Sequence, residues 1–285
     1  MARTLYDRER HRPLAFRYGF DAGVVLLSYT ALALWHLGYP DQALKRGNEA
    51  LALAQTLSHP FNLAFAELFF GVLRQYRREA RAAQETAESV IALCAEHGLT
   101  EPLAWATSLH GWAIAERGRH EEGIAQIQEG LAASRAVGAE LNRPYFLTLL
   151  ADAYLDAGRL NECFSALSDA QTAAEEFEDR HHQAEIHRLK GELLLKQSDS
   201  NAAKAQECFQ RAIEIARIQS AKSLELRATT SLAQLLRDTG RRDEARTMLA
   251  EIYGWFTEGF DTADLKDAKA LLEELGAVGL PPRQS

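Results

Sequence analysis

Small residues recur along this chain at an interval of about forty residues. One series places Ala or Gly at the same position of six consecutive segments: Ala31, Gly71, Gly111, Ala151, Gly191 and Ala233. A second series follows twelve residues later, or fourteen in the fifth segment: Ala43, Ala83, Gly123, Cys163, Ala205 and Ala245. Two antiparallel helices approach closely only where the side chains at their crossing are small. The recurrence therefore predicts stacked helical hairpins, which form an α-solenoid.

Glycine occurs where the first helix of a hairpin should end. The stretches Leu-Gly-Tyr-Pro-Asp, Arg-Gly-Arg-His, Ala-Gly-Arg-Leu and Thr-Gly-Arg-Arg fall between the two series, at residues 37–41, 117–120, 157–160 and 239–242. Glycine adopts the left-handed conformation that ends a helix at little steric cost. Prolines at 60, 102 and 144 lie where the next hairpin should begin. Proline is tolerated in a first helical turn because its missing N–H has no intrahelical acceptor there.

The spacing of small and apolar residues is that of the tetratricopeptide repeat, with each unit lengthened from about 34 to about 40 residues. We expect an all-α fold, a tetratricopeptide-like right-handed α-solenoid of about six hairpins with a C-terminal capping helix. Residues 1–22 are interpreted as the remnant of a preceding repeat. The uncapped N-terminal edge that this leaves suggests self-association into a homo-oligomer. Six hairpins are expected within residues 23–258, at 23–58, 61–98, 102–138, 144–179, 182–219 and 222–256. The capping helix with its tail is expected at residues 259–285.

Composition and charge narrow the range of partners. The 7 prolines and 47% hydrophobic residues suit helices throughout. A net charge of -8 repels nucleic-acid phosphates, so no nucleic-acid partner is expected. The basic stretch at residues 74–81 is interpreted as a solvated corner between two helices. No apolar run reaches the length of a membrane span and no export signal is seen at the N-terminus, so we expect a cytoplasmic protein without a membrane partner.

No motif for catalysis or for a cofactor is found. The patterns GxxxxGK[ST], GxGxxG, HExxH, GxSxG and the EF-hand loop do not occur. The three cysteines are too widely spaced for a zinc site. A histidine-rich cluster at residues 181–187 lies where a hairpin should begin, and polar side chains are ordinary there. We therefore predict no catalytic residue, no metal, no cofactor and no enzymatic activity.

Several stretches resemble the C-terminal tetratricopeptide region of large bacterial signalling proteins. They include LYDRERHRPLAFRYG, RPYFLTLLADAY and, as the most specific part, YGWFTEGFDTADL, and the likeness covers roughly Leu5 to Leu275. In that family a class III adenylate/guanylate cyclase domain and a STAND-type or AAA-like ATPase often precede the array. The resemblance implies a regulatory or sensory arm whose partners are those domains, and it carries over no catalytic residue.

The inner wall of the array is the candidate binding surface. In tetratricopeptide arrays the first helix of each hairpin faces the concave side, and the inward positions here are aromatic early and polar late. We predict a groove for a ligand or peptide at Phe65, Trp105, Trp112, Tyr145, Asp152, Arg188 and Glu192. An aromatic stripe is also typical of a buried core, so core packing and ligand contact both remain open for the tryptophans. Replacing them with Ala should separate the two, because lost folding indicates core and lost binding alone indicates a groove.

Three functions follow from this interpretation. The first is a non-catalytic scaffold that binds a protein or peptide partner, including the cyclase or ATPase domains of a parent polypeptide. The second is a sensor for a small molecule or signalling peptide. The third is a self-association module. A continuous concave surface would favour the first, and a closed pocket with a few convergent polar groups would favour the second.

Overall fold

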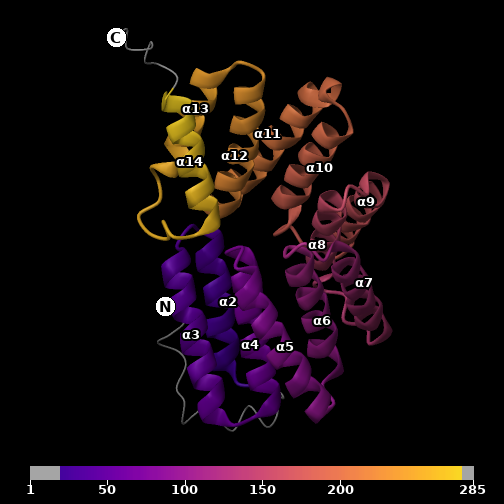
Figure 1. Cartoon of the computed structure of the whole chain (residues 1–285). Coiled ribbons are helices and arrows are strands. Elements are labelled where there is room, and N and C mark those ends of the chain that lie inside the picture. Colours follow the sequence, from indigo (N-terminus) through magenta and orange to yellow (C-terminus); the bar gives the residue numbers. More distant parts are fainter. Residues whose placement is uncertain (1–19, 278–285) are drawn as a thin grey trace.

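The computed structural model describes residues 20–277, which are helical with no strand. This confirms the predicted all-α solenoid, in which six antiparallel hairpins are followed by one more helix (Figure 1). The predicted remnant at residues 1–22 lies outside the described residues except for its last three. The helices are α2 (Ala22–His36) and α3 (Pro40–Leu57), α4 (Pro60–Tyr76) and α5 (Ala80–His97), α6 (Thr100–Ala115) and α7 (His120–Ala136), α8 (Arg143–Asp156) and α9 (Leu160–Glu176), α10 (Gln183–Gln197) and α11 (Ala202–Ile218) with the short helix η2 (Asp199–Asn201) between them, α12 (Lys222–Asp238) and α13 (Arg242–Tyr253), and α14 (Ala263–Ala277).

The turn inside most hairpins contains a left-handed residue. Gly38, Gly118, Gly158 and Gly240 have φ angles of 88°, 87°, 72° and 83°, which confirms the role predicted for glycine in these turns. The second hairpin has Arg78 at the equivalent position, with a φ of 59°. For a residue other than glycine, this conformation costs about 1–2 kcal/mol of conformational energy. The contacts of the Arg78 side chain must therefore compensate for local strain.

The crossing of α6 and α7 shows why small residues recur. A Cβ added to Gly111 would lie 2.7 Å from the carbonyl oxygen of Gly123, and one added to Gly123 would lie 2.8 Å from the amide nitrogen of Ala115. These are backbone atoms, which cannot move without separating the helices. A Cβ on Gly191 would lie 2.7 Å from the ring of Phe209 in the next helix. All twelve residues of the two recurring series are buried.

The two ends of the solenoid touch each other. The chain completes a turn of the superhelix, and its last helices lie beside the first hairpins (Figure 1). We call this meeting of the two ends the closing contact. It joins residues 35–41 and 76–78 to residues 222–227 and 255–267. The predicted capping helix, α14, packs against α12 and α13 and also forms ion pairs with Arg78 in the turn of the second hairpin.

Hydrogen bonds in the closing contact satisfy backbone groups at helix ends. Ser223 Oγ donates a 2.6 Å hydrogen bond to the carbonyl oxygen of Trp35 near the end of α2. Glu258 Oε1 accepts hydrogen bonds of 3.0 Å from the backbone amides of Asp41 and Gln42. Those amides lie in the first turn of α3, where N–H groups have no intrahelical acceptor and a negative charge is favourable. The C-terminal part of the chain thus caps the first hairpin.

The basic stretch at residues 74–81 is only in part the solvated corner that we expected. The side chain of Arg81 is 83% exposed, whereas Arg77 is only 4% exposed. The guanidinium of Arg77 donates to the carbonyl oxygen of Pro40 at 3.0 Å and to Glu79 at 2.7 Å, and Asp261 lies 3.8 Å away. The prediction was wrong for Arg77 because the closing contact covers it with a segment from the other end of the chain.

Candidate functional site

The inner wall of the solenoid encloses an apolar cavity of about 650 Å³. The inner faces of α2, α4, α6 and α8 line it, together with the loops that precede α8 and α10. Tyr29 and Leu141 at this cavity are 52% and 63% exposed, so its apolar surface meets solvent. Apolar surface of this kind is typical of a binding site. Its aromatic lining residues are Tyr29, Phe69, Tyr76, Trp105, Tyr145, Phe146 and Phe177.

The rings of the apolar cavity pack against one another. The centroids of Tyr29 and Phe69 lie 4.9 Å apart in an edge-to-face arrangement, and those of Trp105 and Phe146 lie 6.2 Å apart. Burial, reinforced by nearby His182 and His181, lowers the pKa of His36 to about 3, so this ring is neutral at pH 7. The cavity therefore presents a rigid aromatic wall without a fixed charge at His36.

A layer of buried side chains, which we call the septum, separates the apolar cavity from a second one. It contains Trp35, Tyr76, Tyr145 and Arg227. The Trp35 and Tyr76 rings stack at 4.6 Å, and the guanidinium carbon of Arg227 lies 4.9 Å from the centroid of Trp35. Tyr145 Oη donates a 3.0 Å hydrogen bond to Oε1 of Gln75. The septum thus narrows the inner surface to a cavity of about 30 Å³, which shares lining residues with both the apolar cavity and the second one.

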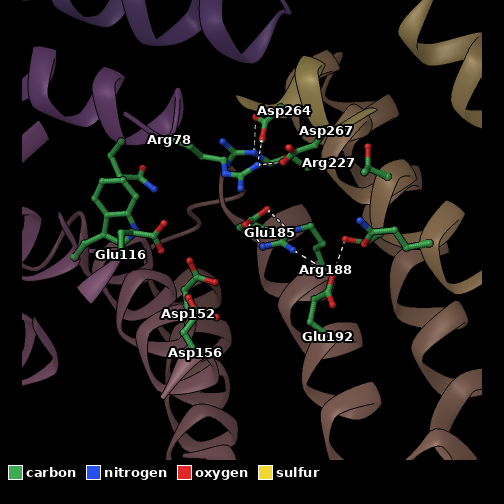
Figure 2. Close-up of a pocket in the computed structure, with 15 residues that line it drawn as sticks. Arg78, Glu116, Asp152, Asp156, Glu185, Arg188, Glu192, Arg227, Asp264 and Asp267 are labelled. Atoms are coloured by element: carbon green, nitrogen blue, oxygen red, sulfur yellow. Dashed lines mark hydrogen bonds and ion pairs between the residues drawn. The ribbon is translucent and has the colours of Figure 1, made fainter. Parts of the chain in front are cut away.

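The acidic cavity lies beyond the septum and measures about 300 Å³. Seven carboxylates and three guanidinium groups line it, from α6, α8, α10, α12, α14 and the turn after α4 (Figure 2). Arg188 on α10 donates to Glu185 at 2.7 Å and to Glu192 at 3.5 Å. Burial alone would raise the pKa of Glu185, but the charge and hydrogen bonds of Arg188 lower it to about 2.

Comparison with known proteins agrees with this architecture. The tetratricopeptide-repeat family profile matches residues 24–45 and 226–251. An uncharacterized protein of Rhizobium meliloti (strain 1021) is 28% identical over 236 residues, which make up 81% of this chain. The chain is similar to tetratricopeptide-repeat proteins. It spans 22% of the length of the Rhizobium relative.

Three solved structures share this helical fold. The structure of NprR in complex with its cognate peptide NprX has a TM-score of 0.62 at 14% identity, covering 88% of this chain and 71% of NprR. The Rap protein complexed with Competence and Sporulation Factor has a TM-score of 0.61 at 11% identity, covering 89% and 74%. The apo form of RapI scores 0.60 at 11% identity, covering 88% and 85%. At these identities the likeness establishes the fold.

Six of the seven predicted groove residues line the cavities. Trp105 and Tyr145 lie at the apolar cavity, and Trp112, Asp152, Arg188 and Glu192 at the acidic one. Phe65 is not among the lining residues and stacks on Phe69 with a centroid distance of 4.3 Å. Trp112 is 2% exposed and belongs to the hydrophobic core, whereas Trp105 is only partly buried. Of the two tryptophans, Trp105 therefore has more of its surface exposed to solvent.

Other lining residues were missed in the sequence. Phe69 and Tyr76 follow Phe65 by four and eleven residues, a spacing that keeps all three near one face of α4 and could have identified them. Arg78 and Asp264 meet at 3.3 Å although 186 residues separate them, and no local pattern indicates such a contact. Within residues 20–277 no helix has the length and hydropathy to cross a bilayer, and no three His, Cys, Asp or Glu side chains could jointly hold a metal ion.

Asp152 makes the stability of the protein depend on pH. Burial, opposed by Arg188 and reinforced by the carboxylates of Glu116, Asp156 and Glu185, raises its pKa to about 7. The pKa of Asp is about 3.9 in the unfolded chain, so Asp152 favours folding most below pH ~4, and this contribution is lost as the pH rises through about 7. We expect Asp152→Asn to raise the free energy of unfolding at pH 8 by about 1–3 kcal/mol.

Urea unfolding at several pH values tests this expectation. Asp152→Asn and the unchanged protein should differ least in stability below pH ~3, where Asp152 is protonated in both states. Asp169→Asn is the matched control, because Asp169 lies exposed on α9. A difference between Asp152→Asn and the unchanged protein that is independent of pH would contradict the assignment.

Proposed function

We propose that this chain binds a peptide in its concavity, with an apolar side chain of the peptide in the apolar cavity. The observation that carries the proposal is the 650 Å³ volume that aromatic side chains from four consecutive hairpins surround. Rigid aromatic walls supply a large apolar contact area at low cost in conformational entropy. NprR, which shares the fold of this chain, binds its cognate peptide NprX, and a Rap protein with this fold forms a complex with Competence and Sporulation Factor.

We further propose that peptide binding regulates a larger signalling protein. The Rhizobium relative is longer than the matched region, which makes up 22% of its length. The sequence resembles the array that follows cyclase and ATPase domains in bacterial signalling proteins. A peptide that stabilises one curvature of the solenoid would alter its contacts with such domains, because ligands shift conformational equilibria by differential affinity. Self-association through the N-terminal edge remains a separate prediction.

Replacement of Trp105 by Ala tests peptide binding. Octapeptides selected from a random library against the unchanged protein serve as probes, and fluorescence anisotropy measures their affinity. Because Trp105 lines the apolar cavity, we expect Trp105→Ala to weaken binding by about ten-fold or more, as expected for an aromatic anchor. Circular dichroism would show whether Trp105→Ala still folds.

Phe164→Ala is the matched control for this experiment. Phe164 on α9 is 64% exposed and lies outside the apolar cavity, so its loss should leave the affinity unchanged. Failure to select any peptide would count against the proposal. So would peptides that bind folded Trp105→Ala as tightly as the unchanged protein.

A small-molecule sensor is the second candidate. The septum limits the apolar cavity on one side, and the volume of about 650 Å³ is within the size range of small-molecule sites. A ligand confined to this chamber would contact Trp105 but leave the acidic cavity unchanged. Mass spectrometry of the chain purified from its source cell would identify a bound small molecule and distinguish it from a peptide.

A further inference from the structure

The acidic cavity contains more negative charge than the protein neutralises. Of its three arginines, Arg188 pairs with Glu185 and Glu192. Arg78 Nη1 lies 2.5 Å from Asp267 and 3.3 Å from Asp264. Four of the seven carboxylates are thus paired with two of the guanidinium groups.

The third arginine adds no further neutralised carboxylate. Arg227 Nε lies 2.7 Å from Asp264, which Arg78 already contacts. Asp156 has a distant partner in Lys196, whose Nζ lies 3.7 Å away. In the described part of the chain Glu116 and Asp152 form neither a hydrogen bond nor an ion pair. These two carboxylates, from the end of α6 and from α8, therefore have no ion-pair partner of their own (Figure 2). Burial raises the pKa of both, and a bound cation would favour their charged forms.

A second and independent feature of this cavity is an unpartnered donor. Trp112 lines the cavity, is 2% exposed, and its indole Nε1–H has no hydrogen-bond partner among the described residues. Trp112 precedes Glu116 by one turn of α6, so the donor and one of the two unpaired carboxylates lie on the same helical face. A buried donor without an acceptor is unfavourable. A ligand that brings an acceptor oxygen would remove that cost.

These features select the chemistry of the ligand. A cation would neutralise Glu116 and Asp152, and a carbonyl oxygen would accept the Trp112 N–H. A metal ion is disfavoured, because no three ligating side chains converge in the described residues. A basic residue within a peptide carries both required groups, a cationic side chain and backbone carbonyl oxygens.

We propose that the acidic cavity is the subsite for a guanidinium or ammonium side chain of the bound peptide, held between Glu116 and Asp152, with a peptide carbonyl at Trp112. This inference rests on the proposed peptide-binding function and assigns its second subsite. The peptide then has an apolar residue on one side of the septum and a basic residue on the other. Charge-assisted hydrogen bonds make such a pair strong and specific.

Two matched probes test the subsite. N-acetyl-L-arginine methylamide carries the guanidinium, and N-acetyl-L-citrulline methylamide is its neutral counterpart of similar shape. In the full chain labelled with ¹⁵N at the Trp indoles, we expect the arginine probe to shift the Trp112 N–H resonance and the citrulline probe to leave it unchanged. Trp112→Phe assigns that resonance. Equal shifts with both probes, or no shift of Trp112 with either, would overturn the proposal.

Variants of the two carboxylates sharpen the result. The double variant Glu116→Gln and Asp152→Asn should weaken binding of the arginine probe by about ten-fold or more. Glu214→Gln is the control, because Glu214 lies on α11 away from the cavity and pairs with Arg211. Full retention of affinity by the folded double variant would exclude these carboxylates as the subsite.

A third probe separates this inference from the proposed function. N-acetyl-L-phenylalanine methylamide should shift the Trp105 indole resonance in the apolar cavity. If it does so while the arginine probe leaves Trp112 unshifted, peptide binding stands and the basic subsite is excluded. If the arginine probe shifts Trp112 while the phenylalanine probe fails at Trp105, the basic subsite is supported and the role of the apolar cavity is excluded.

Discussion

Gly130→Ala is expected to lower the free energy of unfolding by about 3 kcal/mol. Gly130 lies where α7 crosses α6, and an added Cβ would lie 2.5 Å from the carbonyl oxygen of Ala104 and 2.8 Å from the amide nitrogen of Ser108. Both are backbone atoms of α6, so the methyl group fits only if the two helices separate. Such a separation would loosen the contacts of the third hairpin with both neighbours. Urea unfolding followed by circular dichroism measures the loss.

Gly276→Ala is the control for this change. A Cβ on Gly276, in the last turn of α14, would meet no atom within 4 Å. Because Ala is a better helix former than Gly by up to about 1 kcal/mol, this variant should be as stable as the unchanged protein or slightly more stable. If Gly130→Ala behaves in the same way, the close approach of α6 and α7 is not required for folding.

Arg227→Ala should lower the free energy of unfolding by about 2–3 kcal/mol and loosen the closing contact. The guanidinium donates to the carbonyl oxygen of Tyr76, pairs with Asp264 at 2.7 Å and lies over the ring of Trp35. One side chain thus joins α12 to α2, α4 and α14. Its removal leaves the backbone carbonyl oxygen of Tyr76 and the carboxylate of Asp264 with fewer partners. Because both groups are mostly buried, this loss lowers the stability of the folded state.

Two measurements distinguish a loosened closing contact from a general loss of stability. Small-angle scattering should show a larger radius of gyration for folded Arg227→Ala, because the two ends of the solenoid would separate. Arg211→Ala is the matched control, since Arg211 is 55% exposed and pairs with Glu214 on the same helix. That change should alter stability by less than about 0.5 kcal/mol. Equal effects of the two variants would show that Arg227 has no special role in the closing contact.

The recurrence of small residues was sufficient to predict the solenoid. Gly111 and Gly123 belong to one hairpin, so their contact is decided by a short stretch of sequence, and small residues occupy the equivalent positions of every unit. The aromatic residues of the inner wall also recur with the repeat. Trp105 and Tyr145 occur at the same position of consecutive units, and both lie at the apolar cavity. Periodic features could therefore be predicted from the sequence, because each unit contacts mainly its neighbours.

The curvature of the array could not be predicted from the sequence in this way. It arises from small rotations between hairpins that accumulate over the whole chain. Ser223 and Trp35 are 188 residues apart, and their hydrogen bond forms only because those rotations bring the two ends together. Arg77 was misjudged for the same reason. Trp255, Glu258 and Asp264 lie within the stretch that carries the most specific resemblance, but their role in the closing contact appears only in the tertiary structure.

The amino-acid sequence by itself determined the all-α class, the hairpin period and the change from aromatic to polar residues along the inner wall. These follow from the size and polarity of side chains at fixed local spacings. Only the tertiary structure decided that the solenoid closes on itself, that a septum narrows its interior and that Glu116 and Asp152 share a cavity without an ion-pair partner. Those outcomes depend on the summed geometry of all the units, because groups from distant helices interact only after the superhelix has brought them within reach.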